Sequence, residues 1–186
     1  MGRVSKAQAE ENRRRVVETA SRMIREQGTH TSVADLMKAS GLTHGGFYKQ
    51  FASKEALLDE ATAHAFAELA QHHKEEVEQH AGRRDAAQQA LIDTYLSVEH
   101  RDSAAQGCPV AALATDMARE PGDGEARRVY TEGVRDFAAF LTTDDQDGIT
   151  RLSTMVGALV LARATEGSPL SEEILAAARA ALTATG

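Results

Sequence analysis

The chain has 186 residues, of which 42% are hydrophobic and 26% are charged. This composition is typical of ordinary globular proteins and excludes a disordered chain or a fibrous repeat. The longest stretch free of Asp, Glu, Lys and Arg is residues 103–115, whereas a membrane-spanning helix needs about 20 apolar residues. Residues 1–15 are polar and lack the apolar stretch of a secretory signal. We therefore expect a cytoplasmic protein with no membrane partner.

Charge is distributed unevenly along the chain. The whole sequence carries 21 Lys and Arg against 28 Asp and Glu, a net charge of −7. Residues 1–55 contain ten basic and six acidic side chains, so they are net positive while the remainder is strongly negative. This asymmetry predicts a small basic module attached to a larger acidic body. The single cysteine, Cys108, excludes an internal disulfide and a cysteine-based structural zinc site, and no metal or cofactor is expected.

Apolar residues recur at intervals of three and four throughout the chain, which predicts an all-α protein. In the N-terminal part, we expect a first helix that ends at Gly28 and a short second helix between Ser32 and Gly41. Thr43 is expected to cap a third helix, which carries Phe47 and Phe51. These three helices form the first predicted domain, residues 1–52.

The second predicted domain, residues 53–186, contains the remaining helices, which brings the expected total to about nine. Ser53 opens a long helix that reaches about residue 80. Further helices are expected at 83–101, from Pro109 to residue 117, around 129–141, at 152–163 and around 174–182.

Residues 31–58 have the layout of a helix-turn-helix: a short helix, a tight turn and a second short helix. Gly41 suits the positive φ that the turn needs. Burial of the two phenylalanines leaves His44, Gly45, Tyr48 and Lys49 on the outward side. Tyr48 and Lys49 suit contacts with phosphate oxygens, His44 can reach a base edge, and Gly45 permits close approach of the backbone to DNA.

The segments 31–36, 41–51 and 53–57 resemble the DNA-binding domain of TetR-family transcriptional repressors. The run Phe-Tyr-x-x-Phe-x-Ser-Lys-Glu-x-Leu from Phe47 to Leu57 is especially specific. The resemblance implies an N-terminal three-helix DNA-binding domain and a larger all-helical domain for ligand binding and dimerisation. It also implies a homodimer on a palindromic operator, which a small effector releases through a pendulum-like shift of the long helix. The expected DNA contacts are Ser32, Thr43, His44, Gly45, Tyr48, Lys49 and Lys54.

A dimer is also expected on physical grounds, because one short recognition helix contacts only a few base pairs. Two recognition helices related by a two-fold axis would contact half-sites roughly 34–36 Å apart. The helix at 152–163 is too apolar for an isolated surface helix, and we expect it to pair with the 129–141 helix in a four-helix interface. The alternative is that it forms the central core. The expected interface residues are Leu152, Met155, Val156, Leu159 and Val160.

Cys108 is expected at the N-terminus of a helix, where the helix dipole favours the thiolate. The Gly-Cys step there also resembles one branch of the TetR family, whose members include some that respond to electrophiles or oxidants through that cysteine. The alternative is a small buried residue that only packs. Besides Cys108, the residues expected to line an effector pocket are Phe66, Tyr95, Met117, Phe137 and Met155, although ordinary core positions would show the same spacing.

The remaining function classes are less well supported. His72, His73 and His80 lie along the long helix, where we expect a solvated face rather than a metal site. The sequence has no phosphate-binding glycine loop and no hydrolase motif, so no enzymatic activity is expected. A helical protein-interaction module without sequence-specific DNA binding remains the alternative to a regulator. The two differ in salt dependence, because phosphate contacts release counterions.

Overall fold

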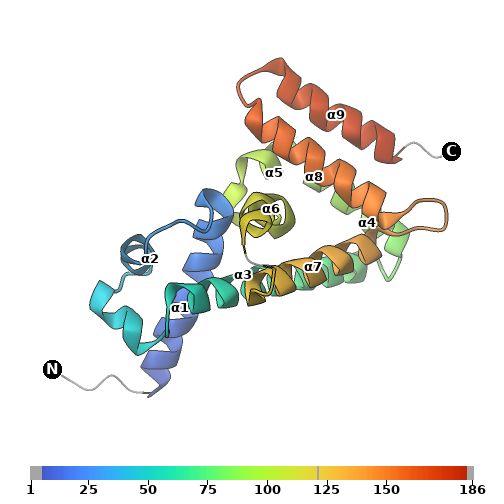
Figure 1. Ribbon diagram of the computed structural model, residues 1–186. Coiled ribbons are helices and arrows are strands. Elements are labelled where there is room, and N and C mark those ends of the chain that lie inside the picture. Colours follow the sequence, from blue (N-terminus) through green and yellow to red (C-terminus); the bar gives the residue numbers. More distant parts are fainter. Residues whose placement is uncertain (1–5, 121, 184–186) are drawn as a thin grey trace.

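The computed structural model describes residues 6–120 and 122–183, so residues 1–5 of the polar 1–15 segment lie outside the described part (Figure 1). All regular elements among these residues are helical, which confirms the all-α class. They are α1 (Lys6–Gln27), α2 (Val33–Ala39), the 3-10 helix η1 (His44–Lys49), α3 (Lys54–Gln79), α4 (Arg84–Tyr95), α5 (Val98–Asp102), the 3-10 helix η2 (Ala104–Gln106), α6 (Pro109–Arg119), α7 (Glu125–Leu141), α8 (Gly148–Ala164) and α9 (Pro169–Thr183). None of these helices is both long and apolar enough to cross a membrane.

The helix boundaries near the N-terminus follow from local chemistry. The Ser32 hydroxyl accepts a hydrogen bond of 3.1 Å from the backbone N–H of Asp35, and Ser53 caps α3 in the same way. Gly28 and Gly41 follow α1 and α2 with φ of +85° and +70°, a conformation that L side chains rarely adopt. The predicted ends of these helices are confirmed.

Two predicted elements differ from the structure. The element after the turn is a 3-10 helix, and Thr43 stands at its start without a side-chain capping bond. The helix expected at 83–101 is two helices, because Ser97 accepts a hydrogen bond of 3.1 Å from the N–H of His100 and starts α5. A serine hydroxyl that bonds nearby backbone competes with a continuous helix.

The N-terminal core joins more than the first three helices. Its buried residues from α1 to η1 and the following turn are Val16, Ala20, Ile24, Leu36, Met37, Phe47 and Phe51. Leu57 and Ala61 of α3 join them, as do Leu113 and Met117 of α6. The domain boundary after residue 52 stays a prediction, but this packing attaches both α3 and α6 firmly to the N-terminal module.

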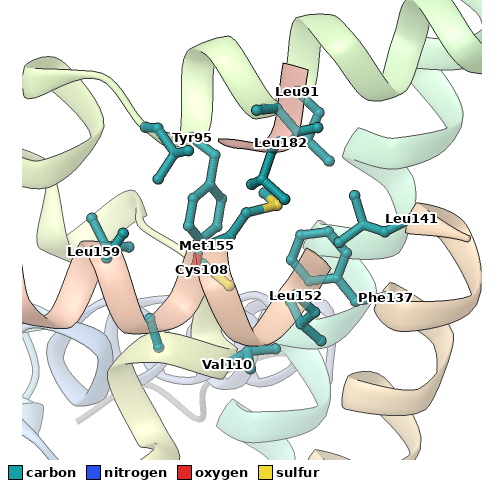
Figure 2. Close-up of a cluster of buried hydrophobic side chains, with 14 of the residues drawn as sticks. Leu91, Tyr95, Cys108, Val110, Phe137, Leu141, Leu152, Met155, Leu159 and Leu182 are labelled. Atoms are coloured by element: carbon teal, nitrogen blue, oxygen red, sulfur yellow. The ribbon is translucent and has the colours of Figure 1, made fainter. Parts of the chain in front are cut away.

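A second core fills the C-terminal body (Figure 2). Helices α3 and α7 lie against each other so closely that a Cβ on Gly133 would come within 2.0 Å of the Phe66 ring. Helices α8 and α9 form an antiparallel pair on the far side of the body from η1 (Figure 1). Helix α3 contributes to both cores and therefore connects the two parts of the molecule.

Candidate functional site

The exposed side of η1 carries the residues expected to contact DNA. Thr43, His44, Gly45, Tyr48 and Lys49 are all exposed, and the Tyr48 side chain is 68% exposed. The buried ring of Phe47 packs edge-on against Tyr48, with 5.1 Å between the two ring centroids. This anchor fixes the direction in which the exposed side chains project, so the element presents a defined polar surface.

Three of the expected contacts have particular surroundings. A Cβ on Gly45 would meet no atom within 4 Å, so packing inside the protein does not require glycine there. Ser32 is exposed, but its hydroxyl already caps α2 and donates a 2.5 Å hydrogen bond to the Asp35 carboxylate. Lys54 is half-buried at the first position of α3. The surface of η1 is thus freer for a partner than Ser32 or Lys54.

Two ion pairs tie α1 to the long helix α3. Arg13 is 2.6 Å from the Glu60 carboxylate, and its guanidinium lies over the Phe51 ring at 4.3 Å. Arg25 is 2.9 Å from the Glu68 carboxylate, and only 7% of the Arg25 side chain is exposed. These two pairs add polar contacts to the packing of α1 on α3.

A cavity of about 280 Å³ lies where α1 meets the C-terminal body. Its lining residues come from α1, α3, α4, α5, α7 and the segment 106–109: Arg22, Arg25, Ala65, Glu68, Leu69, His72, Leu91, Thr94, Tyr95, His100, Gln106, Gly107, Cys108, Pro109 and Phe137. Three of the residues expected to line an effector pocket are among them: Tyr95, Cys108 and Phe137.

The other expected pocket residues lie elsewhere. Phe66 lines a second cavity of about 170 Å³ between α3 and α7. Met117 belongs to the N-terminal core, and Met155 is fully buried in the C-terminal core. Helical periodicity places all of these residues inside, but it does not distinguish a filled core from the wall of a cavity.

Cys108 stands at the N-terminus of α6, as expected, but its thiol is buried. Burial raises the pKa of the thiol, and this outweighs the opposing effect of the nearby N–H groups of α6. The thiol is therefore protonated at neutral pH, which disfavours direct reaction as a thiolate. The Tyr95 ring is also buried, with its hydroxyl end directed toward Cys108 (Figure 2). Burial, together with the neighbouring Cys108, raises the pKa of Tyr95.

The polar lining of the cavity was not expected from the sequence. Arg22 and Arg25 are three residues apart near the end of α1, a spacing that places both on one helix face. This spacing is the only feature of the sequence that could have indicated that Arg22 and Arg25 line one site. Glu68 and His100 come from distant elements, and His100 Nδ1 donates a 2.7 Å hydrogen bond to the Tyr95 carbonyl oxygen.

His73 corrects the expectation of a solvated histidine face on α3. Its side chain is buried between aromatic rings of α7, stacked on Phe140 at 4.5 Å and tilted against Phe137 at 4.5 Å. Burial and the neighbouring His72 lower the pKa of His73 to about 4. Its Nε2 atom finds no hydrogen-bond partner among the residues that the structure describes. No group of three or more His, Cys, Asp or Glu side chains in the described residues is arranged to hold a metal ion.

The expected dimer residues of α8 divide into two groups. Leu152, Met155 and Leu159 are at most 4% exposed and pack in the C-terminal core of their own chain. Val156 is half-buried and Val160 is 42% exposed. Because the helix is apolar all round, the sequence pattern does not show which of its faces is covered within the chain.

Comparisons with known proteins agree with this geometry. Residues 16–61 match the profile of bacterial regulatory proteins of the tetR family. A comparison with curated protein sequences finds no significant match. Among solved structures, E. coli NemR in its reduced form is 20% identical, with a TM-score of 0.75 over 93% of this chain and 95% of that one.

Two further structures share the fold. A TetR transcriptional regulator from Chloroflexus aurantiacus is 23% identical, with a TM-score of 0.73 over 95% of this chain and 94% of that one. AibR in complex with isovaleryl coenzyme A and operator DNA is 17% identical, with a TM-score of 0.63 over 91% and 97%. The matched N-terminal segment contains the exposed face of η1 and its buried anchor, and the fold is shared over almost the whole chain. Residues 16–61 therefore match the N-terminal helix-turn-helix domain of tetR-family transcriptional regulators, and the chain shares the fold of such regulators over almost its whole length.

Proposed function

We propose that the protein is a homodimeric repressor that binds a palindromic operator and is released when a small molecule occupies the cavity between α1 and α4. The main support for this proposal is the exposed polar face of η1. The buried side chain of Phe47 anchors this face, and both lie within residues 16–61, which match the tetR-family profile. A repressor bound to operator DNA works in the cytoplasm.

The outer side of α8 and α9 supports the homodimer. Val160, Leu161 and Leu170 are 42%, 56% and 49% exposed, although they are large apolar side chains. Ala176 and Ala177 of α9 are also exposed, and side chains this small permit close approach of another helix. In contrast, the exposed side of α7 is mostly charged, so the four-helix interface that we propose pairs α8 with α9 rather than with α7.

The position of the cavity supports release by a ligand. Its walls include α1 of the N-terminal module and α3, which are joined by the ion pair between the lining residues Arg25 and Glu68. Helix α6 starts at the cavity with Cys108 and contacts the N-terminal module further along, where Asp116 accepts a 2.8 Å hydrogen bond from the N–H of Thr29. A ligand that changes these contacts alters the orientation of η1 and hence the distance between the two recognition elements of a dimer.

Modification of Cys108 is proposed as a second route of release. A reagent must first enter the cavity, because the thiol is buried and protonated. An adduct would then occupy the same space as a ligand. Under this proposal, Cys108→Ser remains bound to operator DNA when quinones, aldehydes or hypochlorite are added, whereas the wild-type protein dissociates. Equal release of both proteins from DNA would rule out modification of Cys108 as a route. It would not contradict release by a reversibly bound ligand.

The similar structures lend further support. AibR is described with both isovaleryl coenzyme A and operator DNA bound, so a protein of this fold accommodates a small molecule and DNA together. For this chain we propose operator DNA and a small-molecule effector as the partners.

DNA binding is tested by a gel shift with the DNA upstream of the protein's own gene, over a series of salt concentrations. The affinity should fall steeply as salt rises. Lys49→Ala should weaken binding to all sequences and reduce the salt slope by about 1, whereas His44→Ala should mainly relax base choice. Lys74→Ala is the matched control, because Lys74 is an exposed lysine on the far half of α3. Absence of salt-sensitive binding to any DNA would favour the protein-interaction module instead.

A further inference from the structure

One histidine in the wall of the cavity between α1 and α4 is held in a fixed orientation. The backbone N–H of His100 donates a 3.1 Å hydrogen bond to the Ser97 hydroxyl, and its carbonyl oxygen accepts one of 3.2 Å from Arg163. The imidazole Nδ1 atom is 2.7 Å from the Tyr95 carbonyl oxygen, and 4.6 Å separates the centroids of the His100 and Tyr95 rings. Both the backbone and the ring of His100 are therefore anchored.

The contact with the Tyr95 carbonyl decides which ring nitrogen of His100 carries the proton. A carbonyl oxygen only accepts hydrogen bonds, so Nδ1 must be the protonated nitrogen. Burial lowers the pKa of His100, and this outweighs the opposing effect of the hydrogen bond to Tyr95, so the imidazole is neutral at pH 7. The Nε2 atom then has a free lone pair and acts as a hydrogen-bond acceptor.

The Nε2 atom of His100 is available to a ligand. It forms no hydrogen bond with any residue that the structure describes. In contrast to the Nε2 atom of His73, it is not enclosed by the protein. Because His100 lines the cavity and its Nδ1 atom is already bonded within the chain, Nε2 is the ring nitrogen that a hydrogen-bond donor in the cavity can use.

The charges around the cavity restrict which donor suits this nitrogen. Arg22 and Arg25 line the cavity, and Glu68, the only carboxylate among its described lining residues, is paired with Arg25 at 2.9 Å. The resulting net positive charge disfavours an ammonium group, and a carboxylate has no proton to donate. A neutral hydroxyl group meets both conditions.

The rest of the wall favours a small aromatic ligand. Leu69, Leu91, Tyr95 and Phe137 contribute apolar or aromatic surface, and aromatic rings pack favourably against other rings. The volume of about 280 Å³ is close to the lower limit for ligand pockets, roughly 300–1,000 Å³. A compound with a single ring suits this size better than a multi-ring compound or a nucleotide does.

We propose that the cavity binds a small neutral phenol, whose hydroxyl donates a hydrogen bond to His100 Nε2 and whose ring packs against the apolar wall. This inference rests on the proposed function, because it assigns a chemical class to the effector of that site.

The test is calorimetric titration of the full-length protein, without DNA, with 4-ethylphenol and with its methyl ether, which has no proton to donate. The phenol should bind at least about fivefold more tightly, the effect of one hydrogen bond. His100→Phe keeps a ring but removes the acceptor, so it should weaken phenol binding about fivefold and leave ether binding nearly unchanged.

His80→Phe is the matched control. His80 is also half-buried, and its Nδ1 atom is likewise 2.8 Å from a backbone carbonyl oxygen, that of Glu76, but His80 does not line the cavity. This variant should bind both compounds as the wild-type protein does. Loss of the phenol preference in His80→Phe would contradict a specific role of His100.

A second measurement on the wild-type protein does not depend on the folding of a variant. Nitrogen NMR of the ¹⁵N-labelled protein should show His100 with a protonated Nδ1 and an unprotonated Nε2. The Nε2 resonance should shift when 4-ethylphenol is added and stay in place when the ether is added. A protonated Nε2, or a resonance that the phenol does not move, would overturn the inference.

The titrations can overturn the inference in three ways. Equal affinity for phenol and ether would do so, as would binding of neither compound at millimolar concentration. A phenol preference that persists in His100→Phe would come from ligand size and would do so too. Operator binding by the same preparations is scored separately. A protein that binds its operator but not the phenol contradicts only this inference, and one that binds the phenol but no DNA contradicts only the proposed function.

Discussion

The buried histidine on α3 gives the protein a specific sensitivity to acid. His73 is 8% exposed and stacked on Phe140, and its pKa falls from 6.5 to about 4 in the folded chain. Between these two values the unfolded chain binds a proton that the folded chain does not, so stability decreases as pH falls. A tenfold change in proton affinity corresponds to about 1.4 kcal/mol. The free energy of unfolding should therefore fall by about 3 kcal/mol from this group alone between pH 6.5 and pH 4.

His73→Phe isolates this contribution, because phenylalanine keeps a stacked ring but does not titrate. Urea unfolding of both proteins at several pH values between 7 and 4 measures the difference. The variant should be at least as stable at pH 7, since no group in the described part of the chain forms a hydrogen bond with the His73 Nε2 atom. Its advantage should grow by about 3 kcal/mol toward pH 4. An advantage that is constant over this range would refute the assignment of a buried, neutral histidine.

Three further predictions concern recognition, assembly and packing. Gly45→Ala should leave the midpoint of thermal unfolding unchanged or slightly raised, because a Cβ there meets nothing within 4 Å. The same variant should bind operator DNA more weakly in a gel shift. Full affinity would exclude close approach of the backbone to DNA at this position. Val160→Glu should convert the dimer to monomer in sedimentation analysis, whereas Ala67→Glu on the exposed side of α3 should not; a dimeric Val160→Glu protein would place the interface elsewhere. Gly133→Ala should lower the free energy of unfolding by about 1–3 kcal/mol, since its Cβ would lie 2.0 Å from the Phe66 ring; equal stability in urea would show that this ring moves freely.

Features set by local chemistry could be predicted from the sequence. Ser32 and Ser53 start α2 and α3, and Gly28 and Gly41 end α1 and α2, because capping hydroxyls and left-handed glycines act within a few residues. The outward face of η1 was predictable for the same reason. Once Phe47 is recognised as an anchor, its neighbours must point to solvent.

Features that depend on tertiary packing could not be predicted in this way. Arg25 and Glu68 are distant in the sequence and meet only because α1 packs on α3. His73 is on a charged stretch of α3, but α7 covers it. Met155 and Val160 both lie on α8, one fully buried and the other 42% exposed, and an all-round apolar helix carries no periodic signal that separates them.

Selection of ligands from a randomised duplex DNA library by the full-length protein tests the central claim most directly. A dimer that presents two η1 elements should enrich a two-fold symmetric motif, with half-site centres about 34–36 Å, or a multiple of that distance, apart. The same selection with Lys49→Ala should give the same motif at lower affinity. Recovery of sequences without a shared motif, at the affinity of the starting library, would contradict recognition of an operator by this face.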